Sequence, residues 1–134
     1  VNTSDFPAEA LYDNVSLVTG FTPDPFLVSI VAGGDSAASD ELGAACAGNV
    51  TSKQPDVALN YTAGSNFGLY LYAEAAEDTT LILLGPDGWY CDDDSHGDLN
   101  PGVSIERPLS GDYLIWVGTF DGGDADAELG ISEY

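Results

Sequence analysis

The residue types best suited to chemistry lie together in one acidic stretch. Asp92, Asp93 and Asp94 are consecutive, and Asp98 and Asn100 follow shortly after them. Calcium takes about six to eight oxygen ligands, and closely spaced carboxylates supply them without long side chains. The alternative is a solvated acidic turn neutralised by bulk counterions, because adjacent like charges repel one another. The predicted ligands of a Ca²⁺ ion are Asp87, Asp92, Asp93, Asp94, Asp98 and Asn100.

A second acidic group lies near the C-terminus. Asp124, Asp126 and Glu128 alternate with alanines, so on a strand they share one face. We expect a charged outer face over an inner face of small residues. The alternative for this group, together with Asp121, is a second cation site or a calcium bridge between subunits.

The sequence offers little for catalysis. His96 is the only histidine, and its neighbour Ser95 points the other way on an extended chain. A serine hydrolase needs such a base beside its nucleophile, and the Gly-x-Ser-x-Gly elbow is absent. Carboxylates abound, but nothing marks one pair as the two acids of a glycosidase. We therefore predict that the chain is not an enzyme.

Aromatic residues offer a different kind of surface. Rings on one face of a sheet can stack against sugars, whereas the same rings more often fill the core of a sandwich. Trp116 lies in the middle of a strand pattern, where a core position is expected. Both interpretations stay open for the set Tyr70, Tyr72, Trp89, Tyr90, Trp116 and Phe120.

The cysteine and asparagine patterns are typical of an exported, extracellular protein. Cys46 and Cys91 allow a single disulfide pairing, the alternative being two reduced, buried thiols. The first residue is Val1 and not Met, which is consistent with removal of a signal peptide or with a chain that is only part of a precursor. Four Asn-x-Ser/Thr triplets occur, whereas about one is expected by chance. They are either glycosylation sites or an accident of composition. The triplets begin at Asn2, Asn14, Asn49 and Asn60.

The charge balance excludes several partners. The 134 residues carry 23 acidic and only two basic side chains, Lys53 and Arg107, for a net charge of −21. Nucleic acids and anionic membranes both need contacts from Lys or Arg, so neither is an expected partner. Arg107 is a candidate internal counter-charge for a carboxylate. High salt or divalent cations relieve such self-repulsion, which favours a saline or calcium-containing setting outside the cell.

Alternation with a period of two, typical of β-strands, runs through most of the chain. The length fits one domain, and no apolar run reaches the length of a membrane span. Residues 1–12 lack alternation and are expected to be an arm that docks elsewhere, including on a neighbouring molecule, or a frayed terminus. Residues 13–134 are expected to form an all-β domain, a jelly-roll-like antiparallel β-sandwich of eight or nine strands, with one helical turn within 39–48. The expected strands lie within 15–19, 26–31, 57–61, 69–73, 80–84, 89–91, 103–105, 113–119 and 125–131.

From about residue 33 onward the order of motifs resembles the bacterial pre-peptidase C-terminal (PPC) domain. At 78–84 an acidic residue and two threonines lead into an apolar strand, which is followed by a Gly-Pro-Asp-Gly turn. The acidic loop 92–95, Asn100 and a strand at 109–118 with the motif Ser-Gly-x-Tyr come next. The resemblance implies a small non-catalytic sandwich of secreted proteins, found beside exported peptidases and other hydrolases and in some cases binding calcium. The cysteine pair and the N-terminal stretch depart from the general pattern.

Two functions from different classes follow. The first is a secreted structural module that assembles with copies of itself into an extracellular filament or surface layer, stabilised by calcium. It rests on the N-terminal stretch, the cysteine pair, the acidic loops, and a sandwich edge that can accept a strand from a neighbour. The alternative is an accessory domain of an exported hydrolase that binds carbohydrate or peptide.

Overall fold

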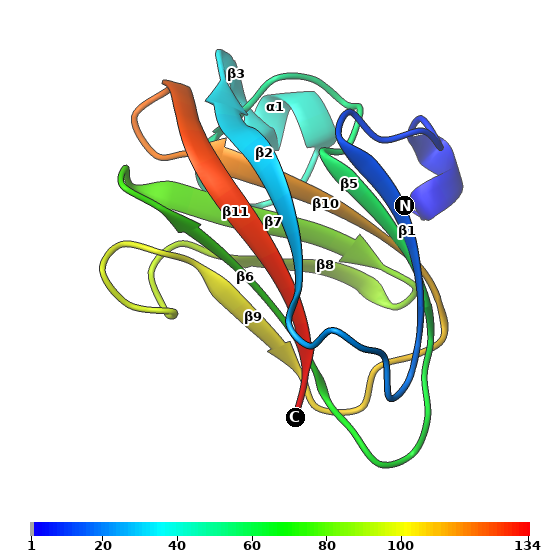
Figure 1. Ribbon diagram of the computed structural model, residues 1–134. Helices are drawn as coiled ribbons and strands as arrows, with labels where there is room; N and C mark the ends of the chain where they lie inside the picture. The colour runs from blue at the N-terminus through cyan, green and yellow to red at the C-terminus, as the bar shows by residue number, and fades with distance from the viewer. Residues whose placement is uncertain (1) are drawn as a thin grey trace.

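The computed structural model describes residues 2–134, which contain eleven strands and two short helices joined by loops (Figure 1). The strands form two facing sheets, which confirms the predicted all-β sandwich. The seven-stranded sheet contains β1 (Asp13–Val18), β3 (Ser36–Ala37), β4 (Asn49–Val50), β5 (Val57–Thr62), β7 (Thr79–Gly85), β8 (Gly88–Asp92) and β10 (Gly111–Thr119). The four-stranded sheet contains β2 (Phe26–Gly34), β6 (Leu69–Ala75), β9 (Gly102–Ile105) and β11 (Gly123–Glu133). The helices are η1 (Thr3–Asp5) and α1 (Ala38–Leu42), and neither has the length or apolar character to cross a membrane.

Each of the nine predicted strands is present, and α1 overlaps the segment 39–48 that was expected to hold a helical turn, starting one residue earlier. The additional strands β3 and β4 have two residues each, which is too short for alternation to show. One pairing departs from the antiparallel expectation, because β1 runs parallel to β5 from Asp13 opposite Val57 to Val18 opposite Thr62. A parallel pair needs a long connection, and here the whole of β2 to β4 lies between the partners.

The main core lies between the sheets and is built by alternating apolar residues. Val57, Leu59 and Tyr61 of β5 point inward, and Leu69 and Leu71 of β6 meet them from the opposite sheet. Burial of one such side chain stabilises the fold by about 1.5 to 3 kcal/mol. The alternation therefore fixes the register, because a shift by one residue would expose a whole inward row.

A second core covers the outer face of the seven-stranded sheet. It contains Ile82 and Leu84 of β7, Leu114 and Trp116 of β10, and Cys46. The helix α1 and the loop after it lie over this face, so β7 is buried on both sides. A continuous apolar pattern such as that of this strand is typical of a central position, and β7 does lie between β10 and β8.

The N-terminal arm packs on its own domain. The ring of Phe6 makes edge-on contacts with Trp89 and Trp116, at centroid distances of 5.7 and 5.3 Å. Farther along, the Leu11 N–H donates to the carbonyl of Pro55 at 2.9 Å. The surface on which the arm docks in this structure therefore belongs to the same molecule. Val1 lies outside the described residues.

Strand directions give the sandwich two distinct ends (Figure 1). β6 runs from a loop at 63–68 to an acidic turn at 76–78, and the antiparallel β9 runs from the acidic loop 93–101 to the loop 106–110. β10 starts next to this second loop and ends before the turn 120–122. We call the loops 76–78, 93–101 and 120–122 the acidic end, and the loops 63–68 and 106–110 the Arg107 end.

Candidate functional site

The predicted acidic loop lies between β8 and β9, at the acidic end. Oxygen atoms from the carboxylates of Asp92, Asp93 and Asp94 all lie within 4.8 Å of one another. The charge on Asp93 is the main reason why the pKa of Asp94 is raised, and Asp92 and Asp78 add to the effect. Like charges held this close favour a proton or a cation between them.

Asp92 has a structural task in this loop. Its two carboxylate oxygens accept the hydroxyl and the N–H of Ser95, at 2.7 and 2.8 Å, and the N–H of Gly102 at 2.9 Å. Burial alone would raise the pKa of Asp92, but these hydrogen bonds outweigh burial and lower it. The carboxylate thus closes the loop and joins the end of β8 to the start of β9.

The other predicted ligands do not all join this cluster. Asp87 does not lie with the other predicted ligands. It is in the turn at the opposite end of β8, where it accepts a hydrogen bond from the Tyr90 hydroxyl. The side-chain oxygen of Asn100 accepts the Ala75 N–H at 3.1 Å. Asp98 is exposed in the same loop, with a left-handed backbone at a φ of 54°. The carboxylate donors suit a hard cation such as Ca²⁺, and Asp93 and Asp94 are the two best placed to take one.

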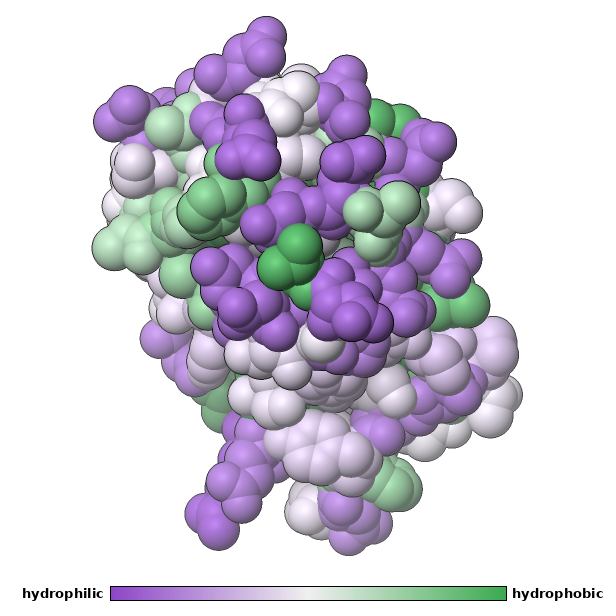
Figure 2. Space-filling model, turned by 90° about the vertical axis from the view of Figure 1, so that its left-hand side faces the viewer, coloured by the Kyte–Doolittle hydropathy of each residue, from purple (hydrophilic) through white to green (hydrophobic). Residues whose placement is uncertain are grey.

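The structure divides the second acidic group. Asp121 and Asp124 join Glu77 and Asp78 around a cavity of about 70 Å³ at the acidic end. Asp126 and Glu128 lie on the outer face of the four-stranded sheet, where Glu128 stands opposite Glu74 of β6. Figure 2 views the side of the molecule that contains the acidic end, and hydrophilic side chains cover most of its upper half.

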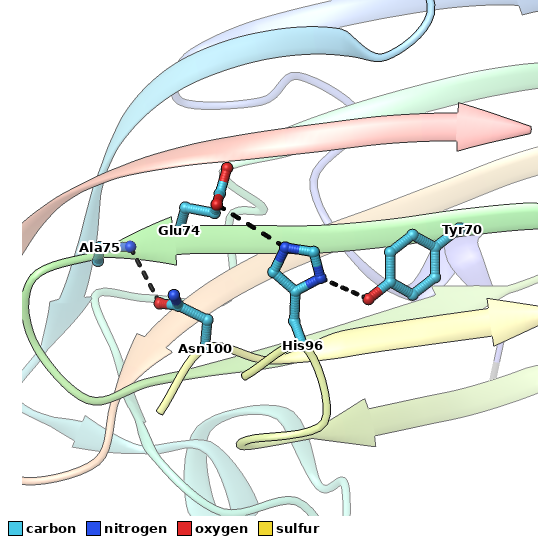
Figure 3. A network of polar contacts seen from close by, with 5 residues as sticks. All are labelled: Tyr70, Glu74, Ala75, His96 and Asn100. Carbon is cyan, nitrogen blue, oxygen red and sulfur yellow. Dashed lines mark hydrogen bonds and ion pairs between the residues drawn. The ribbon is translucent and has the colours of Figure 1, made fainter. Parts of the chain in front are cut away.

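An aromatic cluster lies on this same outer face of the four-stranded sheet (Figure 3). Tyr72 stacks on the ring of His96, with centroids 4.4 Å apart and planes 19° from parallel. The hydroxyl of Tyr70 lies 2.6 Å from Nδ1 of His96, and Nε2 of His96 lies 3.8 Å from Glu74. The cluster brings together a half-exposed ring surface, a histidine and a carboxylate.

Glycines on the two neighbouring strands make this cluster possible. Gly130 of β11 and Gly102 of β9 flank Tyr72 in register. A Cβ at Gly130 would collide with the ring of Tyr72, and one at Gly102 would collide with the hydroxyl of Tyr70. Partial burial is the main cause of the raised pKa of both tyrosines. The Tyr-x-Tyr-x-Glu alternation of β6 predicts one shared face, but the arrival of His96 from a distant loop left no sequence signal.

The remaining aromatic candidates have separate roles. Trp116 and Trp89 pack with Phe6 in and beside the second core, which confirms the core interpretation for Trp116. Tyr90 packs against the main core, and Phe120 is exposed at the acidic end. Only Tyr70 and Tyr72 of the predicted set therefore share one accessible ring surface.

Cys46 and Cys91 form a disulfide, with Cα atoms 5.8 Å apart. Disulfides persist mainly in oxidising compartments, which agrees with an exported protein. Among the predicted glycosylation sites, Asn2, Asn14 and Asn60 are exposed. The amide nitrogen of Asn49 instead donates to the carbonyls of Thr119 and Phe120. A glycan on Asn49 would cost one of these bonds, so this asparagine is the poorest acceptor of the four.

The Arg107 end carries a feature that was not predicted. Phe67, Arg107 and Tyr134 line a groove of about 430 Å³. Leu109 follows Pro108, another residue of this groove, in the sequence. Phe67, Leu109 and Tyr134 are 43%, 50% and 55% exposed, and we call these three residues the apolar patch. Within residues 2–134, His96 with Glu74 is the one basic–acidic pair closer than 4.0 Å. Arg107 therefore does not act as the predicted internal counter-charge.

The solved structures that are similar to this chain include the following two. The pre-peptidase C-terminal domain of a collagenase from Bacillus anthracis matches with a TM-score of 0.54 and 13% sequence identity, over 94% of this chain and 97% of that domain. PliG, a periplasmic inhibitor of g-type lysozyme from Aeromonas hydrophila, matches with a TM-score of 0.45 and 13% identity, over 91% of this chain and 99% of that one. No family model and no curated protein matches the sequence. The fold is therefore PPC-like, as the motif order predicted.

Proposed function

We propose that this chain is an exported, non-catalytic structural module that joins copies of itself into a filament or surface layer. The observation that carries the proposal is the apolar patch of Phe67, Leu109 and Tyr134 beside Arg107. Large apolar side chains gathered on one part of a surface mark an interaction site. A chain of net charge −21 disfavours contact with its own copies, so it needs such a surface to associate at all.

The polar contacts support a non-catalytic role. Ser95 donates its hydroxyl proton to Asp92, whereas the ring nitrogens of His96 face Tyr70 and Glu74. No serine, threonine or cysteine of residues 2–134 is hydrogen-bonded to His96, so the described chain offers no nucleophile with a histidine base.

Calcium has a defined place in the proposal. Asp93 and Asp94 hold neighbouring carboxylates at the acidic end, with Asp92 fixing the loop beneath them. A divalent cation there would neutralise the repulsion that raises the pKa of Asp94. Calcium would then stabilise the subunit and let acidic surfaces approach one another.

We expect the protein to form large assemblies in millimolar calcium and to return to monomers in EDTA. Calcium at 100 times its Kd should also raise the free energy of unfolding by about 2.7 kcal/mol. Negative-stain microscopy, sedimentation velocity and thermal melting measure these effects on the intact protein. An Asp93→Asn/Asp94→Asn variant is expected to lose the calcium response, while Asp13→Asn/Asp40→Asn, with the same change of charge elsewhere, retains it. Monodisperse monomers in calcium and in high salt would contradict the proposal.

The Tyr70, Tyr72 and His96 cluster favours a second candidate, a domain that binds carbohydrate or peptide. The cluster presents half-exposed aromatic rings with polar handles on an uncovered sheet face, an arrangement that suits both ligand classes. The adjacent Glu74 and Glu128 carboxylates would accept hydrogen bonds from hydroxyl or amino groups of a ligand.

For this candidate, Tyr72→Ala is expected to weaken ligand binding at least tenfold, because the ring supplies the flat contact surface. Pull-down on insoluble polysaccharides and titration with soluble peptides measure the effect. Tyr90→Ala is the matched control, since it removes a half-buried tyrosine from a different strand. The candidate is eliminated if the wild-type protein binds none of these ligands.

A further inference from the structure

The two ends of the sandwich differ in chemistry. Leu109 and Arg107 precede β10, whereas Asp121 follows it, so a single strand separates the two ends. The same separation holds along β6, which starts beside Phe67 and leads to Asp78. A nine-residue strand such as β10 spans about 30 Å, so the two ends are unlike surfaces on opposite sides of one molecule.

The Arg107 end presents a positive charge within an apolar rim. Arg107 is exposed and lines one groove with Phe67 and Tyr134. Two acids at the C-terminal end of β11 already accept hydrogen bonds, Asp24 from Ser132 and Glu133 from Tyr61 and Gly20. Glu106 is the neighbouring exposed carboxylate, and it lies more than 4.0 Å from the Arg107 guanidinium. The guanidinium thus keeps its bidentate hydrogen-bonding capacity for a carboxylate outside this molecule.

The acidic end offers the complementary surface. Glu77, Asp78, Asp121 and Asp124 surround one small cavity there. The acidic loop adjoins this cavity, because the Thr79 N–H, next to Asp78, donates to the carbonyl of Leu99 at 3.4 Å. This end also carries two exposed apolar side chains, Leu99 at 55% and Phe120 at 48%. Both ends therefore combine apolar side chains with charge: the Arg107 end carries a guanidinium beside one carboxylate, Glu106, whereas the acidic end carries carboxylates alone.

We propose that copies of this chain join end to end, with the Arg107 end of one copy seated on the acidic end of the next. The proposal rests on the self-association proposed above and names its surfaces and polarity. The two surfaces are different, so the contact is head-to-tail and each added copy leaves both kinds of end open. Such a contact gives an open, polar filament and not a closed pair.

The contact also gives the cation dependence of assembly a physical cause. One arginine neutralises only a part of the acidic end, where six carboxylates lie on three loops. The remaining charges repel the next copy until salt screens them or a divalent cation binds between them. In this contact the apolar side chains of the two ends form a centre that excludes water, and the charged side chains form the rim around it.

Two variants, each blocked at one end, test the head-to-tail contact. Arg107→Glu/Leu109→Glu blocks the Arg107 end, and Leu99→Glu/Phe120→Glu blocks the acidic end. All four side chains are exposed, so circular dichroism and melting should report folded proteins. In calcium concentrations at which the wild type assembles, each variant alone should remain monomeric. An equimolar mixture should form one-to-one dimers and no longer species, because one intact end of each kind remains. Sedimentation velocity and native mass spectrometry distinguish these states, and Lys53→Glu, which lies on neither end, is the control.

The possible outcomes separate this inference from the proposed function. If the wild type assembles and both blocked variants assemble equally well, the end-to-end contact is wrong and self-association stands. Dimers formed by one variant alone would indicate a symmetric contact and would also overturn the head-to-tail arrangement. A wild type that stays monomeric under all calcium and salt conditions overturns both proposals.

Discussion

Asp56→Asn is expected to make the protein more stable at neutral pH and to leave its stability in acid unchanged. Asp56 is 5% exposed and lies just before β5, where β10 changes its pairing partner from β5 to β4. One of its carboxylate oxygens accepts the Val117 N–H at 2.8 Å, in place of a strand partner. Burial raises the pKa of this carboxyl from 3.8 to about 7, against the opposing effect of the Val117 hydrogen bond.

The direction of the pH effect follows from proton binding. Because the folded-state pKa is the higher one, the folded protein holds a proton on Asp56 that the unfolded chain releases above pH 3.8. The contribution of Asp56 to stability is therefore fully present below this pH and is lost as the pH rises to about 7. Three pKa units correspond to about 4 kcal/mol between the two limits. Asparagine keeps an oxygen acceptor for Val117 and has no charge to bury.

Urea unfolding of both proteins between pH 4 and pH 8 measures this effect. We expect Asp56→Asn to gain at least about 2 kcal/mol at pH 8, since the extra amide protons offset a part of the relieved burial cost. Asp13→Asn, which removes an exposed acid at the start of neighbouring β1, should change little. Equal pH profiles for the wild type and Asp56→Asn would show that the buried carboxylate is ionised without cost.

The alternation of apolar residues was sufficient to predict all strands except the two-residue β3 and β4, because burial in a two-layer sandwich depends on side-chain period. Leu81 and Leu83 face the main core while Ile82 and Leu84 face the second one, as a run apolar on both faces requires. The count of two cysteines allowed a single pairing, Cys46 with Cys91, and the structure forms this disulfide instead of leaving two reduced thiols. The acidic loop was also identified as a unit, because three carboxylates are adjacent in the sequence.

What the sequence did not indicate depends on contacts between distant segments. Asp87 and Asp92 are five positions apart, yet they occupy opposite ends of β8, and only the strand assignment separates them. The stacking of His96 on Tyr72 requires the loop after β8 to fold back over β6. Phe67 and Tyr134 meet at one end because the chain terminus pairs with Gly68. Sequence spacing carries no information about such meetings.

The second large effect is expected from removal of the disulfide. Cys46 lies in the second core, whereas Cys91 is exposed on β8, the outermost strand on its side of the seven-stranded sheet. The bond ties the loop after α1 to this edge strand across a sequence separation of 45 residues. A cross-link of this span stabilises a protein by about 4 kcal/mol, mainly by restricting the unfolded chain. That is a large part of the total stability of a small domain, which is about 5 to 15 kcal/mol.

A Cys46→Ala/Cys91→Ala variant is therefore expected to lose about 4 kcal/mol of unfolding free energy. The measurement is urea unfolding of the variant beside the oxidised and the reduced wild type, with the reduced protein as the matched control. The variant should also have a larger m-value, because an unfolded chain without the cross-link exposes more surface. If the variant unfolds at the same urea concentration as the oxidised wild type, packing of α1 and the arm over the second core stabilises this region without the cross-link. The stability of this domain would then not depend on an oxidising compartment.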